Sequence, residues 1–301
     1  MSGCKPFHPG VQAHDDLPDD FFALFLDPSR THSCAYWKDA EYNLEQAQMA
    51  KIDLALDKCE LRPGMTLLDI GCGWGSTMLR ALQRYEVNVI GLTVSENQYR
   101  YVRSLLETRP ADRLSAEVRL QGWEEFDGTV DRIVTIGAFE HFRQERYEDF
   151  FDFAYRALPA DATMLLQTII VYGVHFLRVN GIPLTKDDVD FLRFIRTTIF
   201  PGSELPPPIG PRPRGVREYA REAGFEVTQI QPLQLHYVKT LDHWVAALRY
   251  SKDRAIALSG ERAYYTYLRY LTGCADKFRT GHIDVMQFTC QKDFASQGYS
   301  R

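Results

Sequence analysis

The chain has 301 residues and a formal net charge of −5. This length allows one large α/β domain or two small ones, and the acidic balance argues against a general nucleic-acid binder, which needs a basic excess. No apolar run has the length of a signal core or a membrane span, and the six cysteines form no CxxC pair; we therefore expect a soluble, cytoplasmic protein with reduced thiols, no metal site and at most peripheral membrane contact.

Strand-like apolar runs alternate with amphipathic segments along the first half of the chain. Residues 1–20 are polar and expected to be loose, and Met49, Ile52 and Leu56 then recur at helical spacing. We predict strands at residues 65–71, 87–93, 116–122, 132–137 and 163–170, and helices at 76–85, 95–107 and 145–158. Strands that alternate with helices indicate a parallel sheet covered on both faces, where ligands bind beyond the carboxyl ends of the strands.

The pattern changes after residue 173. Residues 174–200 are rich in apolar side chains and indicate an inserted helical cap, and residues 201–215 form a proline-rich loop. The α/β pattern then resumes and leads to a helix over about residues 261–279 and a strand over residues 284–292. We therefore predict a single domain over residues 1–301, with a lid formed by residues 174–215.

The glycine-rich turn DIGCGWG (69–75), which follows the first predicted strand, indicates a cofactor site. Gly71, Gly73 and Gly75 let the backbone approach a ligand closely, and the N-terminus of the next helix adds exposed N–H groups. The GxGxG spacing fits a dinucleotide poorly, because that fingerprint is GxGxxG, and fits S-adenosylmethionine (SAM) well. We expect Asp69 and the glycine backbone to hold the amino-acid end of SAM, and a purely structural turn is the alternative.

Polar residues near the ends of the next two strands complete the predicted cofactor set. Thr93 and Gln98 stand where many SAM sites place an acidic residue that binds the ribose. Trp123 and Glu124 follow the third predicted strand, where adenine usually lies. This set predicts the cofactor and says nothing about the substrate.

Eight segments form a more specific pattern, in order, between about Leu17 and Lys292. They are FFALFLDPSRTHSCAYW, LLDIGCGWG, NVIGLTVSENQ, GWEEF, IGAFEHF, TIFPG, HYVKTLDHW and YLTGCADKFRTGHIDVMQFT. Together they resemble the mycolic acid cyclopropane synthases and their methoxy-, keto- and hydroxymycolate-forming relatives. The resemblance implies a class I SAM-dependent methyltransferase (Rossmann-like) fold, with a seven-stranded, mostly parallel sheet. It also implies that residues 1–60 cover the cofactor, that residues 174–215 cap the substrate, and that the substrate is a long-chain unsaturated acyl lipid.

The resemblance further implies a pocket for a bicarbonate ion. Glu140, Tyr237 and the backbones of Cys34 and Ile136 match the positions that hold this ion, and Gln167 stands where the family has His. Bicarbonate so placed would remove a proton after methyl transfer and close a cyclopropane ring. A carboxylate beside an anion is unfavourable unless one of them carries a proton, so we expect a raised pKa at Glu140.

Other matching positions surround the cofactor and the acyl chain. His32 and Ser33 would lie over the cofactor, although the family usually has Tyr at the first position. Cys274 matches the cysteine usually marked as the active-site residue, but we do not expect a nucleophile, because methyl passes directly from SAM to the alkene. Aromatic positions around the acyl chain are matched by Phe200, Tyr270 and Phe278. Aromatic faces there can stabilise a carbocation by about 0.5–2 kcal/mol each.

Each assignment has a structural alternative. Glu140 could cap the helix that follows it, and Tyr237 and Cys274 could simply pack in a core. Gln167, in the apolar strand TMLLQTIIVYG, could be a core amide satisfied by its neighbours, since a buried amide without partners costs roughly 1–3 kcal/mol. The basic loop RPRGVR (212–217) could be a solvated loop or could dock an acidic acyl carrier protein.

Departures from the family pattern leave the product open. The change from His to Gln167 removes a group that can carry a proton near neutral pH. Asp15 and Pro18 also replace Tyr and Ser of the family's pattern. The alternatives to a cyclopropane are a hydroxylated or other methyl-branched product, or a catalytically impaired relative that only binds SAM or lipid. The sequence leaves the oligomeric state open.

Overall fold

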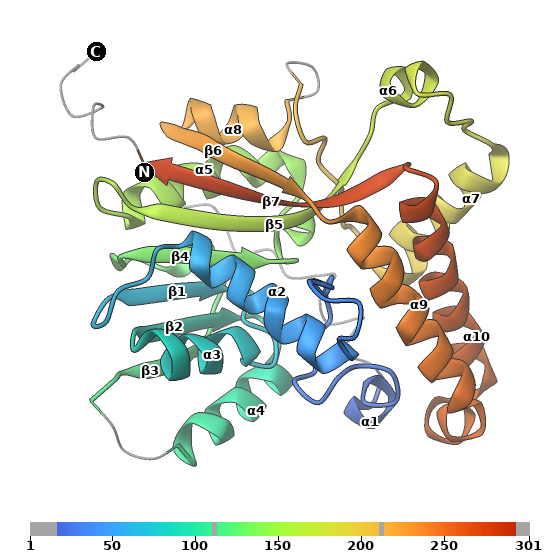
Figure 1. Cartoon of the computed structure of the whole chain (residues 1–301), viewed down its shortest axis with the longest axis horizontal. Coiled ribbons are helices and arrows are strands. Elements are labelled where there is room, and N and C mark those ends of the chain that lie inside the picture. Colours follow the sequence, from blue (N-terminus) through green and yellow to red (C-terminus); the bar gives the residue numbers. More distant parts are fainter. Residues whose placement is uncertain (1–16, 110–112, 211–213, 293–301) are drawn as a thin grey trace.

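The computed structural model of the chain describes residues 17–109, 113–210 and 214–292, so Asp15 lies outside the described residues. Its centre is a seven-stranded sheet in the order β3-β2-β1-β4-β5-β7-β6 (Figure 1). The strands are β1 (Thr66–Ile70), β2 (Asn88–Thr93), β3 (Ala116–Leu120), β4 (Arg132–Ile136), β5 (Thr163–Val171), β6 (Phe225–Pro232) and β7 (Ile283–Lys292). The strands from β3 to β5 run parallel, and β7 lies antiparallel between β5 and β6. The predicted mostly parallel sheet is confirmed.

Helices cover both faces of this sheet. They are α1 (Asp19–Phe22), α2 (Leu44–Lys58), α3 (Ser76–Tyr85), α4 (Glu96–Glu107), α5 (Tyr147–Ala157), α6 (Val174–Val179), α7 (Lys186–Phe194), α8 (Val216–Glu222), α9 (Gln234–Tyr250) and α10 (Lys252–Arg279). Helices α2, α3 and α4 lie in front of the sheet in Figure 1, and α5 and α8 lie behind it. Helices α9 and α10 stand beside the end of the sheet at which the parallel strands finish. None of the described helices is both long and apolar enough to cross a membrane.

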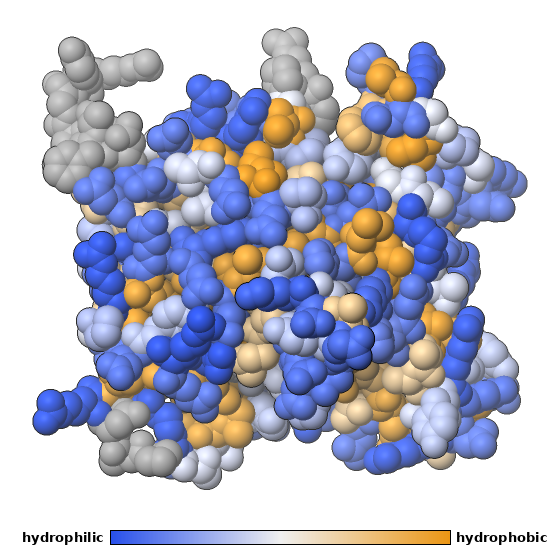
Figure 2. Space-filling model, viewed as in Figure 1, coloured by the Kyte–Doolittle hydropathy of each residue, from blue (hydrophilic) through white to orange (hydrophobic). Residues whose placement is uncertain are grey.

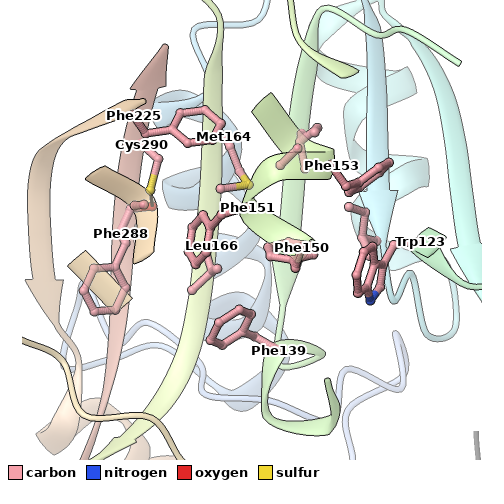
Figure 3. Packing of buried hydrophobic residues seen from close by; sticks show 14 of the residues in the cluster. Trp123, Phe139, Phe150, Phe151, Phe153, Met164, Leu166, Phe225, Phe288 and Cys290 are labelled. Carbon is pink, nitrogen blue, oxygen red and sulfur yellow. Dashed lines mark hydrogen bonds between the residues drawn. The ribbon is translucent and has the colours of Figure 1, made fainter. Parts of the chain in front are cut away.

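The core behind the sheet is rich in aromatic rings (Figure 3). On α5, Tyr147, Phe150, Phe151 and Ala154 recur at helical spacing, and each is at most 1% exposed. The ring of Phe139 stacks on Tyr147 with 4.1 Å between centroids. This packing anchors the segment that follows β4.

Three segments differ from the sequence prediction. Residues 19 and 20 begin the short helix α1, although residues 1–20 were expected to be loose. Helix α9 was not predicted, and its N-cap residue Leu233 makes no side-chain capping bond, so the usual start signal is missing from the sequence. Helix α10 begins before the predicted residue 261, because two helices join across a kink at Gly260, whose φ is 79°.

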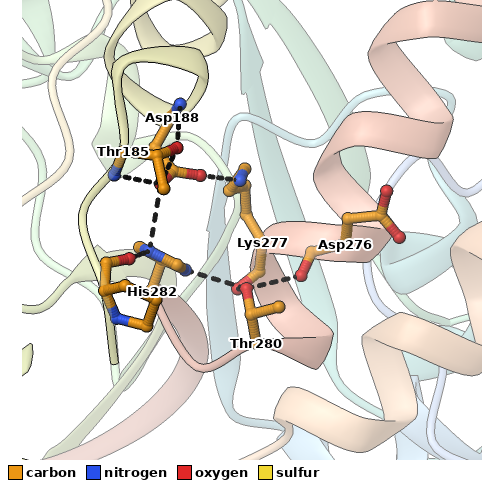
Figure 4. A network of polar contacts seen from close by, with 7 residues as sticks. Thr185, Asp188, Asp276, Lys277, Thr280 and His282 are labelled. Carbon is orange, nitrogen blue, oxygen red and sulfur yellow. Dashed lines mark hydrogen bonds and ion pairs between the residues drawn. The ribbon is translucent and has the colours of Figure 1, made fainter. Parts of the chain in front are cut away.

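The segment between β5 and α8 contains α6 and α7 and lies against α10. Asp188 of α7 forms an ion pair with Lys277 of α10. The carboxyl group of Asp188 also accepts a hydrogen bond from Thr185 and lies close to the ring of His282 (Figure 4). The ring of Phe191 lies directly over Gly273, where an added Cβ would come within 2.1 Å of the ring. Hydrophilic side chains cover most of the face in Figure 2, while the outer side of α6 exposes hydrophobic ones such as Val179.

Candidate active site

A cavity of about 640 Å³ opens at the carboxyl ends of the parallel strands. Its size lies within the range of about 300–1,000 Å³ that is usual for small-molecule sites. All predicted site residues except Gly75 line it: His32, Ser33, Cys34, Asp69, Gly71, Gly73, Thr93, Gln98, Trp123, Glu124, Ile136, Glu140, Gln167, Phe200, Tyr237, Tyr270, Cys274 and Phe278. The position beside β1 and β4, where the strand order reverses, is the expected place for a ligand in such a sheet.

The glycine turn follows β1 and forms one wall of the cavity. Gly71 has a φ of 76°, and a Cβ there would lie 2.5 Å from the Cβ of Ala138. Gly73 has a φ of 54° and no atom within 4 Å of an added Cβ, so its backbone faces open space. Gly75 is the N-cap residue of α3, has a φ of 83° and lies against Val102. The positive φ of Gly75 therefore serves the start of α3, and Gly75 does not line the cavity.

Asp69, at the end of β1, lies at the bottom of this turn. Its side chain is 2% exposed, and its Oδ2 atom has no hydrogen-bond partner among the described residues. Burial raises the pKa of this carboxyl to about 7, while the nearby Lys51 opposes the rise. An unpartnered buried carboxylate oxygen suits a ligand that brings a hydrogen-bond donor, such as the amino group of an amino acid.

Lys51 is a cavity residue that the sequence reading missed. It is 1% exposed on α2, and its Nζ atom donates a hydrogen bond to the Oγ atom of Ser33 at 3.0 Å. Burial lowers its pKa to about 8, against the attraction of Cys34, Asp27 and Asp69. The available signal was its place at helical spacing between Ala47 and Ala55, on the buried face of α2.

The side chains predicted for ribose and adenine lie on the next loops. Thr93 donates a hydrogen bond to the Oε1 atom of Gln98 at 2.8 Å. The Nε1 atom of Trp123 and the Oε2 atom of Glu124 are buried without a hydrogen-bond partner in the described chain. Arg146, which the sequence reading also missed, pairs with Glu124, and its guanidinium lies 5.4 Å from the ring of Trp123. These unpartnered polar atoms fit a polar cofactor that supplies the missing bonds.

Glu140 lies in a short 3-10 helix, Phe139–His141, just after β4. It is 6% exposed, its Oε1 atom accepts a hydrogen bond from the backbone N–H of Ile169 at 2.6 Å, and its Oε2 atom has no partner in the described residues. Burial raises its pKa to about 7, and the hydrogen bond from Ile169 opposes the rise. Burial is therefore sufficient to raise the pKa of Glu140, without the neighbouring anion from which the rise was expected. The alternative role as a helix cap is wrong, because neither the 3-10 turn Gln144–Arg146 nor α5 has a side-chain capping bond at its start.

Tyr237, Cys34 and Cys274 come from three distant segments to the same end of the cavity. Burial raises the pKa of the Tyr237 hydroxyl well above its ordinary value, and Cys34, Cys274 and Glu140 add to the rise, so these four groups lie close together. The ring of Tyr237 packs on Phe278 with 4.7 Å between centroids. Burial also raises the pKa of the Cys274 thiol to about 12, so this sulfur stays protonated near neutral pH and is a poor nucleophile.

Gln167 is a buried strand residue that also borders the cavity. It is 1% exposed, pairs with Ile136 on one side and with Gln287 on the other, and lines the cavity. Its Oε1 atom accepts a hydrogen bond from the Nε2 atom of Gln287 at 3.0 Å. The amide is therefore satisfied by the core at its oxygen while the residue borders the cavity near Glu140.

The far end of the cavity is apolar and aromatic. Phe200 meets the ring of Tyr270 edge to face with 5.5 Å between centroids. Phe191 and Ile195 of the segment between β5 and α8 and Ile283 of β7 also line the cavity. An apolar chamber that continues from a polar cofactor end fits a substrate with a long hydrocarbon chain.

Known proteins match the chain over nearly its whole length. A model of the family described as mycolic acid cyclopropane synthetase matches residues 5–288. The chain is 55% identical, over 289 residues, to cyclopropane mycolic acid synthase 1 of Mycobacterium tuberculosis (strain ATCC 25618 / H37Rv). This match covers 96% of this chain and 98% of that protein. It is 52% identical, over 284 residues, to the methoxy mycolic acid synthase MmaA3 of the same strain, with 94% of each chain covered.

A solved structure agrees with these sequence matches. The mycolic acid cyclopropane synthase CmaA1, complexed with SAH and CTAB, superposes with a TM-score of 0.91 at 55% sequence identity. The match covers 96% of this chain and 99% of that one. The sheet and its covering helices therefore have the class I methyltransferase arrangement predicted from the sequence.

Proposed function

The chain belongs to the mycolic acid cyclopropane synthetase family, and on this basis we propose that it transfers a methyl(ene) group from SAM to the double bond of a long-chain unsaturated acyl lipid of the mycolic acid type. The product of the proposed reaction is a cyclopropane, formed with bicarbonate-assisted deprotonation. As a member of this family the chain is a SAM-dependent methyltransferase. Bicarbonate, the residue roles and the cyclopropane product are parts of the proposal.

The cofactor end supports the binding of SAM, which supplies an electrophilic methyl group when bound. Asp69 offers an unpartnered carboxylate oxygen to the amino group of the ligand. Lys51 adds a buried positive charge next to it, suited to the ligand's carboxylate. The backbone at Gly73 faces open space beside the start of α3, and the segment that carries His32 and Ser33 would cover the site.

The part of the cavity next to Glu140 and Tyr237, here called the anion end, has groups that suit a bicarbonate ion. This ion would supply a base when bound. With a pKa of about 7, Glu140 is partly protonated near neutral pH, so its free Oε2 atom can donate a hydrogen to an anion. Tyr237 adds a protonated hydroxyl, and Gln167 adds an amide at the cavity wall. The backbones of Cys34 and Ile136 would complete the pocket.

The acyl end supports a hydrocarbon substrate. Aromatic rings of Phe200, Tyr270 and Phe278 line a region that excludes water and can stabilise positive charge that develops on the alkene carbon. The relative CmaA1 was solved with the detergent CTAB, which supports a lipid substrate here. We propose that residues 174–215 act as the substrate cap, and that residues 1–60 cover the cofactor within a single domain.

An acyl carrier protein that presents the substrate stays a prediction from the sequence. In the basic loop, Arg214 makes ion pairs with Glu222 and Glu148, and Arg217 pairs with Glu218. These internal pairs occupy two of the three arginines of the loop that was considered for docking an acidic carrier. The remainder of that loop, residues 211–213, lies outside the described residues.

The observation that carries the proposal is the position of Glu140. Its unpartnered Oε2 atom lies in the same cavity as the glycine turn and the aromatic acyl region. The test is incubation of the purified protein with methyl-labelled SAM and unsaturated acyl lipids, with and without bicarbonate, followed by mass spectrometry and NMR. Cyclopropyl proton signals that grow with bicarbonate support the proposal. No label in any lipid, despite measurable SAM binding, would contradict it.

A hydroxylated, methyl-branched product is the alternative outcome, and two observations favour it. The chain is also 52% identical to a methoxy mycolic acid synthase, and Gln167 cannot carry a proton as His does. Slow deprotonation would favour capture of water and a hydroxylated, methyl-branched product. In the same experiment a labelled hydroxyl-bearing lipid, without cyclopropyl signals, would favour this alternative.

A further inference from the structure

Three glutamines stand side by side on adjacent strands, next to the proposed anion end. Gln167 of β5 is paired directly with Gln287 of β7, and Gln287 is paired with Gln231 of β6. Direct partners in a sheet point to the same face, so the three side chains form a row. Gln167 and Gln287 are 1% and 0% exposed, so their amides depend on one another for hydrogen bonds.

Lys58, in the last turn of α2, fixes the row at one end. Its Nζ atom donates hydrogen bonds to the Oε1 atoms of Gln231 and Gln287 at 2.5 and 2.7 Å. An ammonium group only donates, so Gln287 must turn its oxygen toward Lys58 and its nitrogen away from it. This nitrogen is the atom that donates to the Oε1 atom of Gln167 at 3.0 Å.

The orientation of Gln167 follows from this chain of bonds. Its oxygen is held by Gln287, which leaves its Nε2 atom, with two hydrogens, as the polar atom not used by the row. Gln167 also borders the cavity that contains Glu140. An amide turned the other way would present its oxygen to the cavity and repel an anion.

We propose that Lys58, acting through Gln287, is a positioning residue that turns the Nε2 atom of Gln167 toward the cavity so that it donates a hydrogen bond to the bound anion. This inference rests on the anion site of the proposed function and deepens it. It gives Gln167 an anion-binding role that does not require the titratable imidazole of the family pattern.

The test uses two matched glutamate variants of the full chain. Gln287→Glu still accepts a hydrogen bond from Lys58 but cannot donate one to Gln167, so the Gln167 amide must turn its nitrogen toward position 287 and its oxygen toward the cavity. Gln231→Glu adds the same charge and also keeps the bond to Lys58, but position 231 does not contact Gln167. Binding of ¹³C-labelled bicarbonate is measured by NMR in CO₂-depleted buffer with S-adenosylhomocysteine present, and the affinity for that nucleoside is measured by calorimetry as a check of folding.

We expect Gln287→Glu to weaken bicarbonate binding about tenfold or more, as for the loss of a hydrogen bond to a charged group, and Gln231→Glu to change it less than about threefold. Lys58→Met, which frees Gln287 to rotate, should also weaken binding. Equal losses in the two glutamate variants, or no loss in Gln287→Glu, would overturn the positioning role alone. If the wild type itself does not bind bicarbonate, both the anion site and the positioning role are overturned.

Discussion

Glu140 and Ile169 join two neighbouring parallel strands at the carboxyl end of the sheet. The backbone N–H of Ile169 on β5 donates to the Oε1 atom of Glu140, which follows β4, at 2.6 Å. This bond occupies one carboxyl oxygen and leaves Oε2 as the oxygen that can meet a ligand. A rigid strand therefore fixes the direction of the carboxyl, which is a condition for precise acid–base chemistry.

The first prediction concerns the ionisation of Glu140. Its pKa rises from an ordinary 4.5 to about 7 on folding, so the folded state binds more protons than the unfolded state between these pH values. The stabilisation due to the protonated carboxyl is thus complete below about pH 4.5 and is lost as the pH rises through about 7. We expect Glu140→Gln, which cannot ionise, to lack this part of the decline.

The measurement is urea unfolding of both proteins from pH 5 to pH 8. The difference in unfolding free energy between wild type and variant should shift in favour of the variant as pH rises. Asp69 also has a raised pKa but is present in both proteins, so its contribution cancels. A difference that stays constant over this range would contradict the assignment. The same variant should lose methyl transfer by about 100-fold or more while it still binds SAM.

The second prediction concerns Lys51. Lys51→Met should weaken SAM binding about tenfold or more, because it removes a buried positive charge beside Asp69 and the predicted carboxylate position. Thermal stability without ligand should change little or rise, because a buried charge is costly. Calorimetric titration with SAM measures the first effect. Lys38→Met, at an exposed lysine, is the control, and equal affinity in both variants would refute the role.

The third prediction concerns position 167. Gln167→His should preserve or raise turnover with added bicarbonate, because the imidazole can meet the Nε2 donor of Gln287 and carry a proton. Gln167→Leu should lower turnover and also destabilise the fold by roughly 1–3 kcal/mol, because the donor of Gln287 is left buried without a partner. Steady-state kinetics and urea unfolding test both variants. Loss of all activity in Gln167→His would mean that the site is built differently.

The fourth prediction concerns the packing of α7 on α10. Gly273→Ala places a Cβ 2.1 Å from the ring of Phe191, so α7 must shift away from α10. We expect weaker use of long acyl substrates, seen as a higher KM for lipid, with SAM affinity unchanged. Gly173→Ala is the control, since nothing lies within 4 Å of its added Cβ. Adding Phe191→Ala should partly restore the KM, and no recovery would argue against this contact as the cause.

The fifth prediction concerns Cys274. The pKa of its thiol is raised to about 12 by burial, so it should react slowly with iodoacetamide at pH 7 to 8. Cys274→Ser should retain methyl transfer within about tenfold of the wild type, because a covalent nucleophile would cost far more when removed. Mass spectrometry of the treated protein and a kinetic assay are the measurements. A loss of several thousandfold would show that the sulfur takes part in the chemistry.

Local motifs in the sequence were sufficient to predict the fold class, the cofactor and the family. Strand and helix periods produce the alternation that builds a parallel sheet, and the turn at Gly71 and Gly73 needs positive φ values that local residue type reveals. Family motifs also led to Glu140 and Tyr237, which the fold brings into one cavity. Such features are carried by residues that are close neighbours in the chain.

The tertiary structure alone decided the roles that depend on distant partners. Lys58 meets Gln287 across 229 positions of the chain, and this contact sets the direction of the Gln167 amide. Lys51 and the cause of the raised pKa of Glu140 likewise follow from burial, which no local pattern measures. Hydrogen-bond direction and desolvation are properties of the packed surroundings, so they appear only once the strands and helices are in place.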